Sequence, residues 1–208
     1  MPSMTTQVPD LQPDAVIDFW FRDSDTRTLK TAEALNRLWF SGGAVLDEAI
    51  RAQFYTAIEK ALAGGFKDWE CESEARLALI VILDQFTRQA FRGTVRAFVG
   101  DPRAIRLAKS GWDKGYFDTL PAMMQAAALM PLQHSERLED QQLSVARFTE
   151  LAQRFPDVSV LNGFVNSAQK HHDIVARFGR FPHRNSVMGR ASTTSEELYL
   201  SRANRFGQ

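Results

Sequence analysis

The sequence predicts an all-α protein, built as a stack of helical hairpins or a bundle of eight or nine helices. Apolar residues recur every three or four positions over long stretches, as they do on one face of an α-helix. No segment alternates convincingly between apolar and polar residues with the period of a strand. Prolines, glycines and capping residues separate the periodic stretches at ordinary helix lengths. Packed helices are therefore the expected architecture.

The first part of the chain contains three helical patterns. A short apolar helix is expected near residues 16–21, and a second one ends in Trp39-Phe40. The third ends at the glycine pair Gly64-Gly65, which suits the end of a helix. Its apolar stripe repeats at every fourth position, through Leu46, Ile50, Phe54, Ile58 and Leu62.

The most apolar segment lies within a predicted helix from about Ser73 to Thr87. Residues 77–83 are apolar without interruption, so we expect them to form the buried central helix of the bundle. A buried strand is the competing interpretation of such a run. A bilayer-spanning helix needs about 20 apolar residues, so this segment is too short to cross a membrane.

Four further helices are expected in the second part of the chain. Asp101 is the predicted N-cap of the first, and Pro131 is predicted to end the second. Pro156 and Asp157 separate the last two, which we expect to form an antiparallel hairpin. The four helices cover residues 101–111, 121–130, 138–155 and 161–178.

The two ends of the chain differ in character. Residues 179–194 contain Gly, Pro, Asn and Ser without an apolar face, which predicts an ordered loop. Thr194 and Glu197 have the spacing of a capping box and predict a short last helix. Residues 1–12 are predicted to be a disordered tail, and residues 13–208 a single all-helical domain.

Composition limits the classes of partner. The 208 residues include 25 basic and 25 acidic side chains, so bulk charge favours neither nucleic acid nor a membrane surface. No basic residue precedes Arg22, so the start of the chain does not look like a signal peptide. The one cysteine, Cys71, cannot form an internal disulfide and fits a reducing compartment. We therefore expect a cytoplasmic protein that binds neither nucleic acid nor membranes.

The end of the predicted central helix carries the first candidate site. Asp84, Arg88 and Arg92 recur at intervals of four and therefore share one helix face. One interpretation is a salt bridge between helices that closes the bundle, because buried charges are normally paired. The other is an anion site, because the guanidinium fork suits carboxylate and phosphate groups.

Histidines mark the second candidate region. His134 precedes Glu136, and His171 falls on the apolar stripe of its helix. At that position a histidine is either a hydrogen-bonded core residue or a ligand-binding residue. The adjacent His172 points about 100° away on a helix, so the pair is not suited to binding one metal ion. No metal and no cofactor are expected.

The third candidate is an arginine-rich loop. Residues 177–190 contain four arginines and no acidic residue, together with glycine and proline. Such a loop can cradle an anionic ligand. Alternatively, its arginines stack on phenylalanines and bond the carbonyls at the end of a helix. The candidate ligand-binding residues in it are Arg180, His183, Arg184, Asn185 and Arg190.

The leading hypothesis is a helical-hairpin domain whose polar cleft binds an anionic small molecule or an acidic peptide. Arginines from the central helix and from the loop would form its positive wall, beside Asp84 and Asn185. His134, Glu136 and His171 would orient the ligand.

A hydrolase is the competing function. It would act on a phosphate-containing or amide substrate and use His134, His171 or His183 as acid or base, with or without a metal. The spacing of His134 and His172-Asp173 resembles that of the all-helical HD metal-dependent phosphohydrolases. That family requires a further aspartate downstream, and no aspartate follows Asp173.

A scaffold with an exposed aromatic patch is a third class. Its surface would consist of Trp20, Phe21, Trp39 and Phe40. The spacing of these residues suits core packing better.

The polar motifs together also make the chain resemble a known family. They include residues 18–21, 83–86 and 130–136, and the most specific block is 178–185 followed by Gly189-Arg190. Over about residues 14–200 the chain is similar to the bacterial family catalogued as domain of unknown function 924. The resemblance implies an all-helical fold like that of the tetratricopeptide-repeat superfamily, and it implies no reaction.

Overall fold

The computed structural model describes residues 11–22, 29–41 and 43–202, and this described part is all-α, as predicted, with no strand. The rod formed by α4, η2 and α5 is continuous, so the described residues form nine helical rods. Short 3₁₀ segments join them: η1 (Asp68–Cys71), η3 (Val95–Phe98) and η4 (Pro182–Arg184). The rods are α1 (Pro13–Phe21), α2 (Leu29–Ser41), α3 (Gly43–Leu62), α4 (Ser73–Ile80) with the π-helical η2 (Val81–Phe86) and α5 (Thr87–Ala90), α6 (Asp101–Asp113), α7 (Ala122–Gln133), α8 (Leu138–Arg154), α9 (Val160–Phe178) and α10 (Thr194–Leu200).

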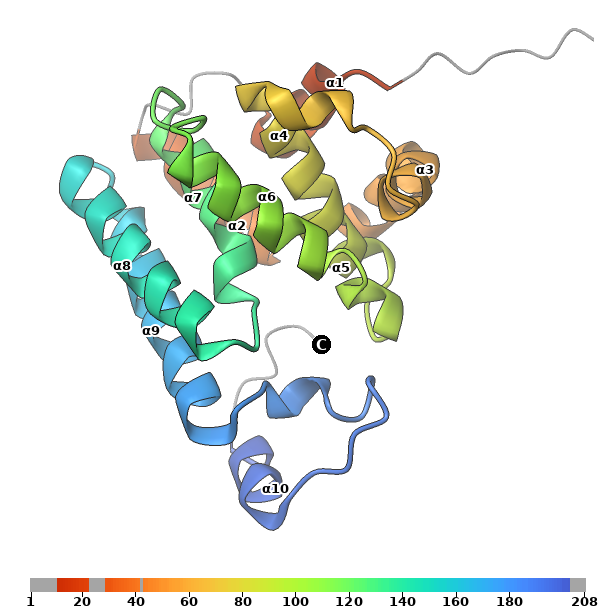
Figure 1. Cartoon of the computed structure of the whole chain (residues 1–208), viewed down its shortest axis with the longest axis vertical. Coiled ribbons are helices and arrows are strands. Elements are labelled where there is room, and N and C mark those ends of the chain that lie inside the picture. Colours follow the sequence, from red (N-terminus) through yellow and green to blue (C-terminus); the bar gives the residue numbers. More distant parts are fainter. Residues whose placement is uncertain (1–10, 23–28, 42, 203–208) are drawn as a thin grey trace, which may run out of the picture.

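The helices pack around the central rod. The predicted hairpin is present: α8 and α9 run side by side, and α7 packs on both of them (Figure 1). On its other side α7 contacts α6 and the central rod, while α1 packs on α4. The segment from Gly179 to α10 passes the lower end of the bundle in this view, below α5 and the turn between α7 and α8.

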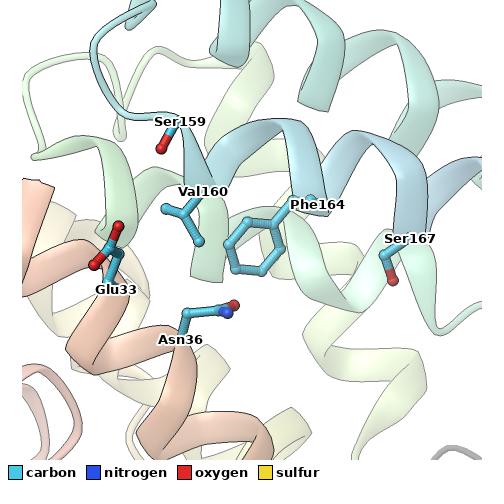
Figure 2. A pocket seen from close by; sticks show the side chains of 7 residues that line it. Glu33, Asn36, Ser159, Val160, Phe164 and Ser167 are labelled. Carbon is cyan, nitrogen blue, oxygen red and sulfur yellow. The ribbon is translucent and has the colours of Figure 1, made fainter.

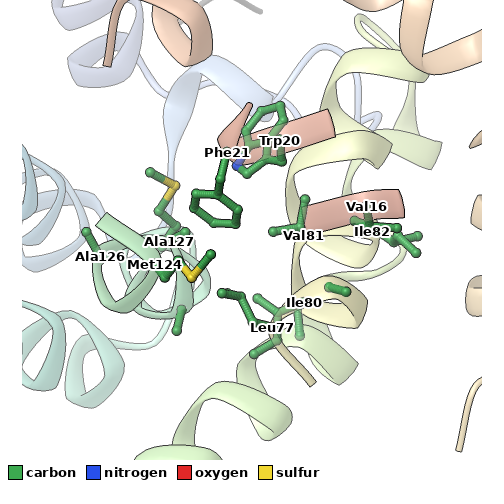
Figure 3. Packing of buried hydrophobic residues seen from close by; sticks show 14 of the residues in the cluster. Val16, Trp20, Phe21, Leu77, Ile80, Val81, Ile82, Met124, Ala126 and Ala127 are labelled. Atoms are coloured by element: carbon green, nitrogen blue, oxygen red, sulfur yellow. The ribbon is translucent and has the colours of Figure 1, made fainter. Parts of the chain in front are cut away.

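Apolar burial explains the central position of this rod. Residues 77–83 are at most 1% exposed, so the buried-helix prediction is confirmed and the competing strand is wrong. Trp20 and Phe21 of α1 lie over η2 from one side, and Met124 of α7 lies opposite α4 (Figure 3). The hydrophobic effect therefore holds α1, α7 and the central rod together.

The aromatic residues considered for an exposed patch are part of this core. Trp20 and Trp39 stack with ring centroids 5.6 Å apart, and both side chains are buried. Phe21 packs edge-on against Trp39. The side chain of Phe40 lies outside the described residues. The interpretation as an exposed aromatic surface is therefore wrong for the three described members.

Three helix ends differ from the prediction. Pro131 does not end α7, which continues to Gln133, because the helix is buried throughout and its packing outweighs the one missing hydrogen bond. Gly100 is the N-cap of α6, so Asp101 lies in the first turn and its carboxylate is used elsewhere. The capping box of α10 is formed by Thr193 and Glu196, one residue earlier than predicted.

This capping box yields a first prediction. We expect Thr193→Ala to destabilise α10 by about 1 kcal/mol, because the threonine hydroxyl accepts the backbone N–H of Glu196. Amide hydrogen exchange should then be about fivefold faster in α10 than in the parent protein. Ser195→Ala is the control, since Ser195 is exposed and lies within the same turn. Equal exchange rates in the two variants would contradict the capping role.

Two further statements concern the chain as a whole. Within the described ranges, no helix has the length and apolarity needed to cross a membrane. Residues 1–10 of the predicted tail lie outside the described residues, so the division into a tail and one domain stays a prediction.

Candidate functional site

The candidate site is built on the π-helical turn of the central rod. Within η2 the helix is wider than an α-helix, and the N–H of Thr87 donates to the carbonyl of Ile82, five residues earlier. Such turns are rare and occur frequently at functional sites. Asp84 lies in this turn and is only 1% exposed. The wider turn therefore carries a buried carboxylate at the centre of the molecule.

Gly100 allows α6 to begin against the same turn. A Cβ atom on Gly100 would lie 2.1 Å from the carbonyl oxygen of Leu83, so any side chain there would clash with backbone. The next residue, Asp101, faces Arg88, whose guanidinium donates to both carboxylate oxygens at 2.9 and 3.0 Å. Arg88 also lies 3.0 Å from the carboxylate of Asp84. The predicted salt bridge between helices is therefore present, with Asp101 as the partner on α6.

His134 and Arg184 complete a connected group of charges. Nδ1 of His134, at the end of α7, lies 2.8 Å from Oδ1 of Asp84. Nη2 of Arg184, in η4, donates to the backbone carbonyl of His134 at 2.9 Å, and its Nη1 lies 3.5 Å from Asp101. We call Asp84, Arg88, Asp101, His134 and Arg184 the five-residue network. It joins four helical elements to the C-terminal loop.

Arg184 occupies an unusual environment within this network. Its guanidinium lies 4.6 Å from the ring centroids of both Phe98 and Phe181, and the residue is 5% exposed. The predicted stacking of loop arginines on phenylalanine is therefore confirmed here. Its Nε is buried and makes no hydrogen bond within the described part of the chain. A buried guanidinium normally has most of its donors paired, so this one is under-satisfied.

Three of the four histidines gather beside the network. The rings of His134 and His171 are 6.3 Å apart, and Phe181 lies 5.4 Å from both His171 and His183. Nδ1 of His171 is 2.8 Å from the backbone carbonyl of Ser167 one turn earlier in α9. His171 is thus a hydrogen-bonded core residue at the edge of the site, which was one of the two interpretations of its position.

Electrostatics set the charge state of the acid–histidine pair. Burial alone would raise the pKa of Asp84, but Arg88 and the contacts from His134 and Gln85 hold it well below its usual value. Burial and the nearby Arg88 lower the pKa of His134, against the opposing effect of Asp84. At neutral pH the carboxylate is therefore charged and the imidazole neutral. The five-residue network then carries no net charge, because its two carboxylates balance its two guanidiniums.

Burial affects the other basic groups in the same direction. It lowers the pKa of His171 to about 3. Burial together with Arg184 lowers the pKa of His183 to about 3. Burial and the proximity of Arg88 lower the pKa of Arg184 to about 10. Asp101, Glu136 and Asp84 oppose this decrease only in part.

The remaining predicted residues have their own carboxylate partners. Arg92 lies beyond the end of α5, so it leaves the face of Asp84 and Arg88 and bonds Asp47 of α3 at 2.8 and 2.9 Å. Arg180 bonds both oxygens of Glu196 at 2.7 and 2.8 Å. The structure thus brings neither arginine to the five-residue network.

Glu136 connects the loop to the turn between α7 and α8. Arg190 donates to both of its carboxylate oxygens at 2.6 and 2.9 Å, and the backbone N–H of Phe181 donates to it at 2.8 Å. Nε of Arg190 is buried and makes no hydrogen bond among the described residues. Asn185, also predicted as a site residue, donates to Ser192 within the loop.

Sequence reasoning missed Asp101 as a member of the site. A carboxylate before a proline is an ordinary helix start, so the pattern supplied a sufficient local explanation. Only the resemblance to a family, whose pattern contains Phe98 and Asp101, carried a signal. The carboxylate partners Asp47 and Glu196 were missed because they lie far from their arginines in the sequence.

The donor set does not suit a metal. Among the described residues, no group of three His, Cys, Asp or Glu side chains is arranged to hold a metal ion. Ser135, the hydroxyl nearest to His134 in sequence, donates to Asp140 at 2.7 Å. The arrangement combines a charged carboxylate, a neutral imidazole and an under-satisfied guanidinium, which suits binding of a small anion and removal of a proton by the imidazole.

Comparison with known proteins supports the fold and identifies the family. The chain is similar to a solved structure, a protein of unknown function, ATU0120, from Agrobacterium tumefaciens, with a TM-score of 0.76 and 29% sequence identity. The similarity covers 92% of this chain and 97% of that one. No curated protein matches the chain. The model of the family described as bacterial protein of unknown function (DUF924) matches residues 16–204, and the chain therefore belongs to the DUF924 family.

Proposed function

We propose that the protein binds a small anionic molecule through Arg184. The observation that carries this proposal is a guanidinium that is 5% exposed, has an unbonded Nε and lies 3.5 Å from its nearest carboxylate. A buried charge is costly unless it is paired, so an anion bound here would be stabilised by the full guanidinium.

The geometry around Arg184 explains why its charge is available. Arg88 donates hydrogen bonds to both carboxylate oxygens of Asp101. Asp101 therefore lies at a longer distance, 3.5 Å, from Arg184. Repulsion from Arg88 adds to the effect of burial and lowers the pKa of Arg184 to about 10. A bound carboxylate or phosphate would relieve this repulsion. The Nδ1–H of neutral His134 donates to Asp84, so its Nε2 is left to accept a hydrogen bond from a hydroxyl group of the same ligand.

The size of the ligand follows from burial. Two phenylalanine rings lie 4.6 Å from the Arg184 guanidinium and the residue is 5% exposed, so a peptide segment is too large to reach it without displacing the loop. Arg180 and Arg190, the other candidates for an acidic peptide, are each bonded at two carboxylate oxygens. We therefore favour a small metabolite over an acidic peptide. Its source would be the cytoplasm, in keeping with the single cysteine of the chain.

A thermal-shift screen tests the proposal. The panel contains small carboxylates, phosphorylated sugars and nucleotides, each as a salt of the same cation. A ligand at about 100 times its Kd adds about 2.7 kcal/mol to the free energy of unfolding, which raises Tm by about 5–10 °C. We expect such a shift with at least one anion and its loss in Arg184→Gln. Binding measured by calorimetry on the folded variant separates lost affinity from lost stability.

Arg147→Gln is the matched control. Arg147 is paired with Glu150 on the surface of α8, away from the network, so this variant removes one guanidinium and should keep the shift. A shift that survives in Arg184→Gln would overturn the proposed contact. If no anion of the panel raised Tm, the proposal of anion binding itself would be overturned.

Proton transfer is a second candidate function, supported by one observation. The charged Asp84 orients His134 at 2.8 Å, while burial and Arg88 lower the pKa of the imidazole and hold it neutral, the form required of a general base. A hydrolase without a metal would place water between His134 and the anion held by Arg184. Breakdown of the ligand found in the screen, lost in His134→Gln, would support this function. Recovery of the ligand unchanged would contradict catalysis and would leave anion binding as the one supported function.

A further inference from the structure

A groove beside the N-terminal half of α9 lies apart from the five-residue network described above. It has a volume of about 450 Å³ and lies between α2 and α9 (Figure 2). Its lining consists of Glu33, Asn36, Ser159, Val160, Gly163, Phe164 and Ser167. Binding sites for small molecules commonly have a volume of about 300–1,000 Å³, so the groove is large enough for one.

The groove combines an apolar floor with a polar rim. Val160 and Phe164 project from α9 toward α2, and Asn36 points at the ring of Phe164 from the other side. Phe164 is fixed from below, because it stacks on Phe148 at 5.7 Å and meets Trp39 at 6.4 Å. The ring is only 4% exposed, so it forms a rigid apolar floor that needs no reordering on binding.

Gly163 is the second observation that points to a ligand. A glycine inside a helix costs about 0.5–1 kcal/mol relative to alanine. A Cβ on Gly163 would meet no atom within 4 Å, and its backbone is ordinary helix. Nothing in the folded chain therefore requires a glycine at this position. Close approach of a ligand to the helix backbone would require one.

The charge of the lining selects the class of ligand. Its polar groups are one carboxylate, one amide and two hydroxyls, and none of the described side chains that line the groove is basic. The carboxylate of Glu33 lies at the edge of the groove beside Val160. We propose that this groove binds a small organic cation, an amine attached to a flat apolar group. The amine would lie against Glu33 and Asn36, and the apolar group between Phe164 and Gly163.

Titration calorimetry with 2-phenylethylamine tests the proposal. The neutral 2-phenylethanol and the anionic 3-phenylpropionate have nearly the same shape and differ in charge. We expect the amine to bind about fivefold more tightly than the alcohol, the size expected for one partly exposed ion pair, and the anion to bind most weakly in the groove. Equal affinity for all three compounds would overturn the proposal that the groove selects a cation.

Two variants and their controls locate the binding. Glu33→Gln should weaken amine binding about fivefold, whereas Glu139→Gln removes an exposed carboxylate from α8 and should have no effect. Gly163→Leu should abolish binding while keeping the fold, since the new side chain enters open space and favours helix. Asn162→Leu, one residue earlier and exposed, is its control. Unchanged binding in Gly163→Leu would overturn the site.

This inference is independent of the proposed function at Arg184. Arg184→Gln should leave amine binding unchanged, and Gly163→Leu should leave the anion-induced rise in Tm unchanged. Either site can therefore fail its test without affecting the other.

Discussion

Between pH 7 and pH 5 the protein is expected to lose about 4 kcal/mol of its free energy of unfolding. Burial lowers the pKa of His171 and of His183 from 6.5 to about 3. As the pH falls through 6.5, the unfolded chain therefore takes up protons that the folded protein does not, and stability decreases. Over this interval each histidine accounts for about 2 kcal/mol. The positively charged Arg184 opposes protonation of both histidines in the folded protein, and Arg88 also opposes that of His171.

Urea unfolding at pH 7, 6 and 5 and constant ionic strength measures this effect. His171→Gln should remove about half of the decrease, because the variant has one fewer group to protonate. His172→Gln controls for loss of a histidine at this part of α9. Aspartate and glutamate contribute mainly below this range, since their ordinary pKa values are 3.8 and 4.5. Equal stability at pH 7 and pH 5 would show that the histidines accept protons in the folded protein.

Asp101→Asn should reduce the free energy of unfolding by about 3–5 kcal/mol, because it leaves two buried guanidiniums, Arg88 and Arg184, with Asp84 as the one remaining carboxylate of the network. Arg88 loses its two-oxygen partner, and Arg184 loses the carboxylate at 3.5 Å. The asparagine has the same shape, so the change removes charge and leaves packing intact. Chemical denaturation at pH 7 gives the difference directly.

Two further variants separate charge from other causes. Asp113→Asn changes an exposed aspartate at the other end of α6 and should alter stability by at most about 0.5 kcal/mol. Adding Arg184→Gln to Asp101→Asn removes one of the orphaned charges and should recover part of the loss. A double variant whose losses simply add would contradict the coupling of these two residues.

The fold could be predicted because its helices follow from the regular spacing of apolar residues along the chain. The stripe from Leu46 to Leu62 and the hairpin of α8 and α9 follow from spacing along the chain, and burial of residues 77–83 follows from composition. Local rules failed where tertiary packing outweighed them. Pro131 stays within α7 for this reason, and the π-helical turn left no mark in the apolar pattern.

The site was predictable only in part. Asp84, Arg88, His134 and Arg184 were all selected for their residue type and position, and the structure joins them. Which carboxylate pairs with which arginine depends on contacts between distant segments, such as Arg92 with Asp47 across 45 positions. Helix spacing alone placed Arg92 with Asp84, because it could not show that the rod ends at Ala90.

The π-helical turn in the central rod makes the length of this segment more critical than its composition. Each residue of an α-helix advances the chain by about 100° around the axis. A substitution between Asp84 and Arg88 alters one side chain, whereas deletion of one residue there would turn Arg88 relative to Asp84 by about that angle. Chains that carry this arrangement should therefore vary in residue type along the rod and stay constant in the number of residues between Asp84 and Arg88.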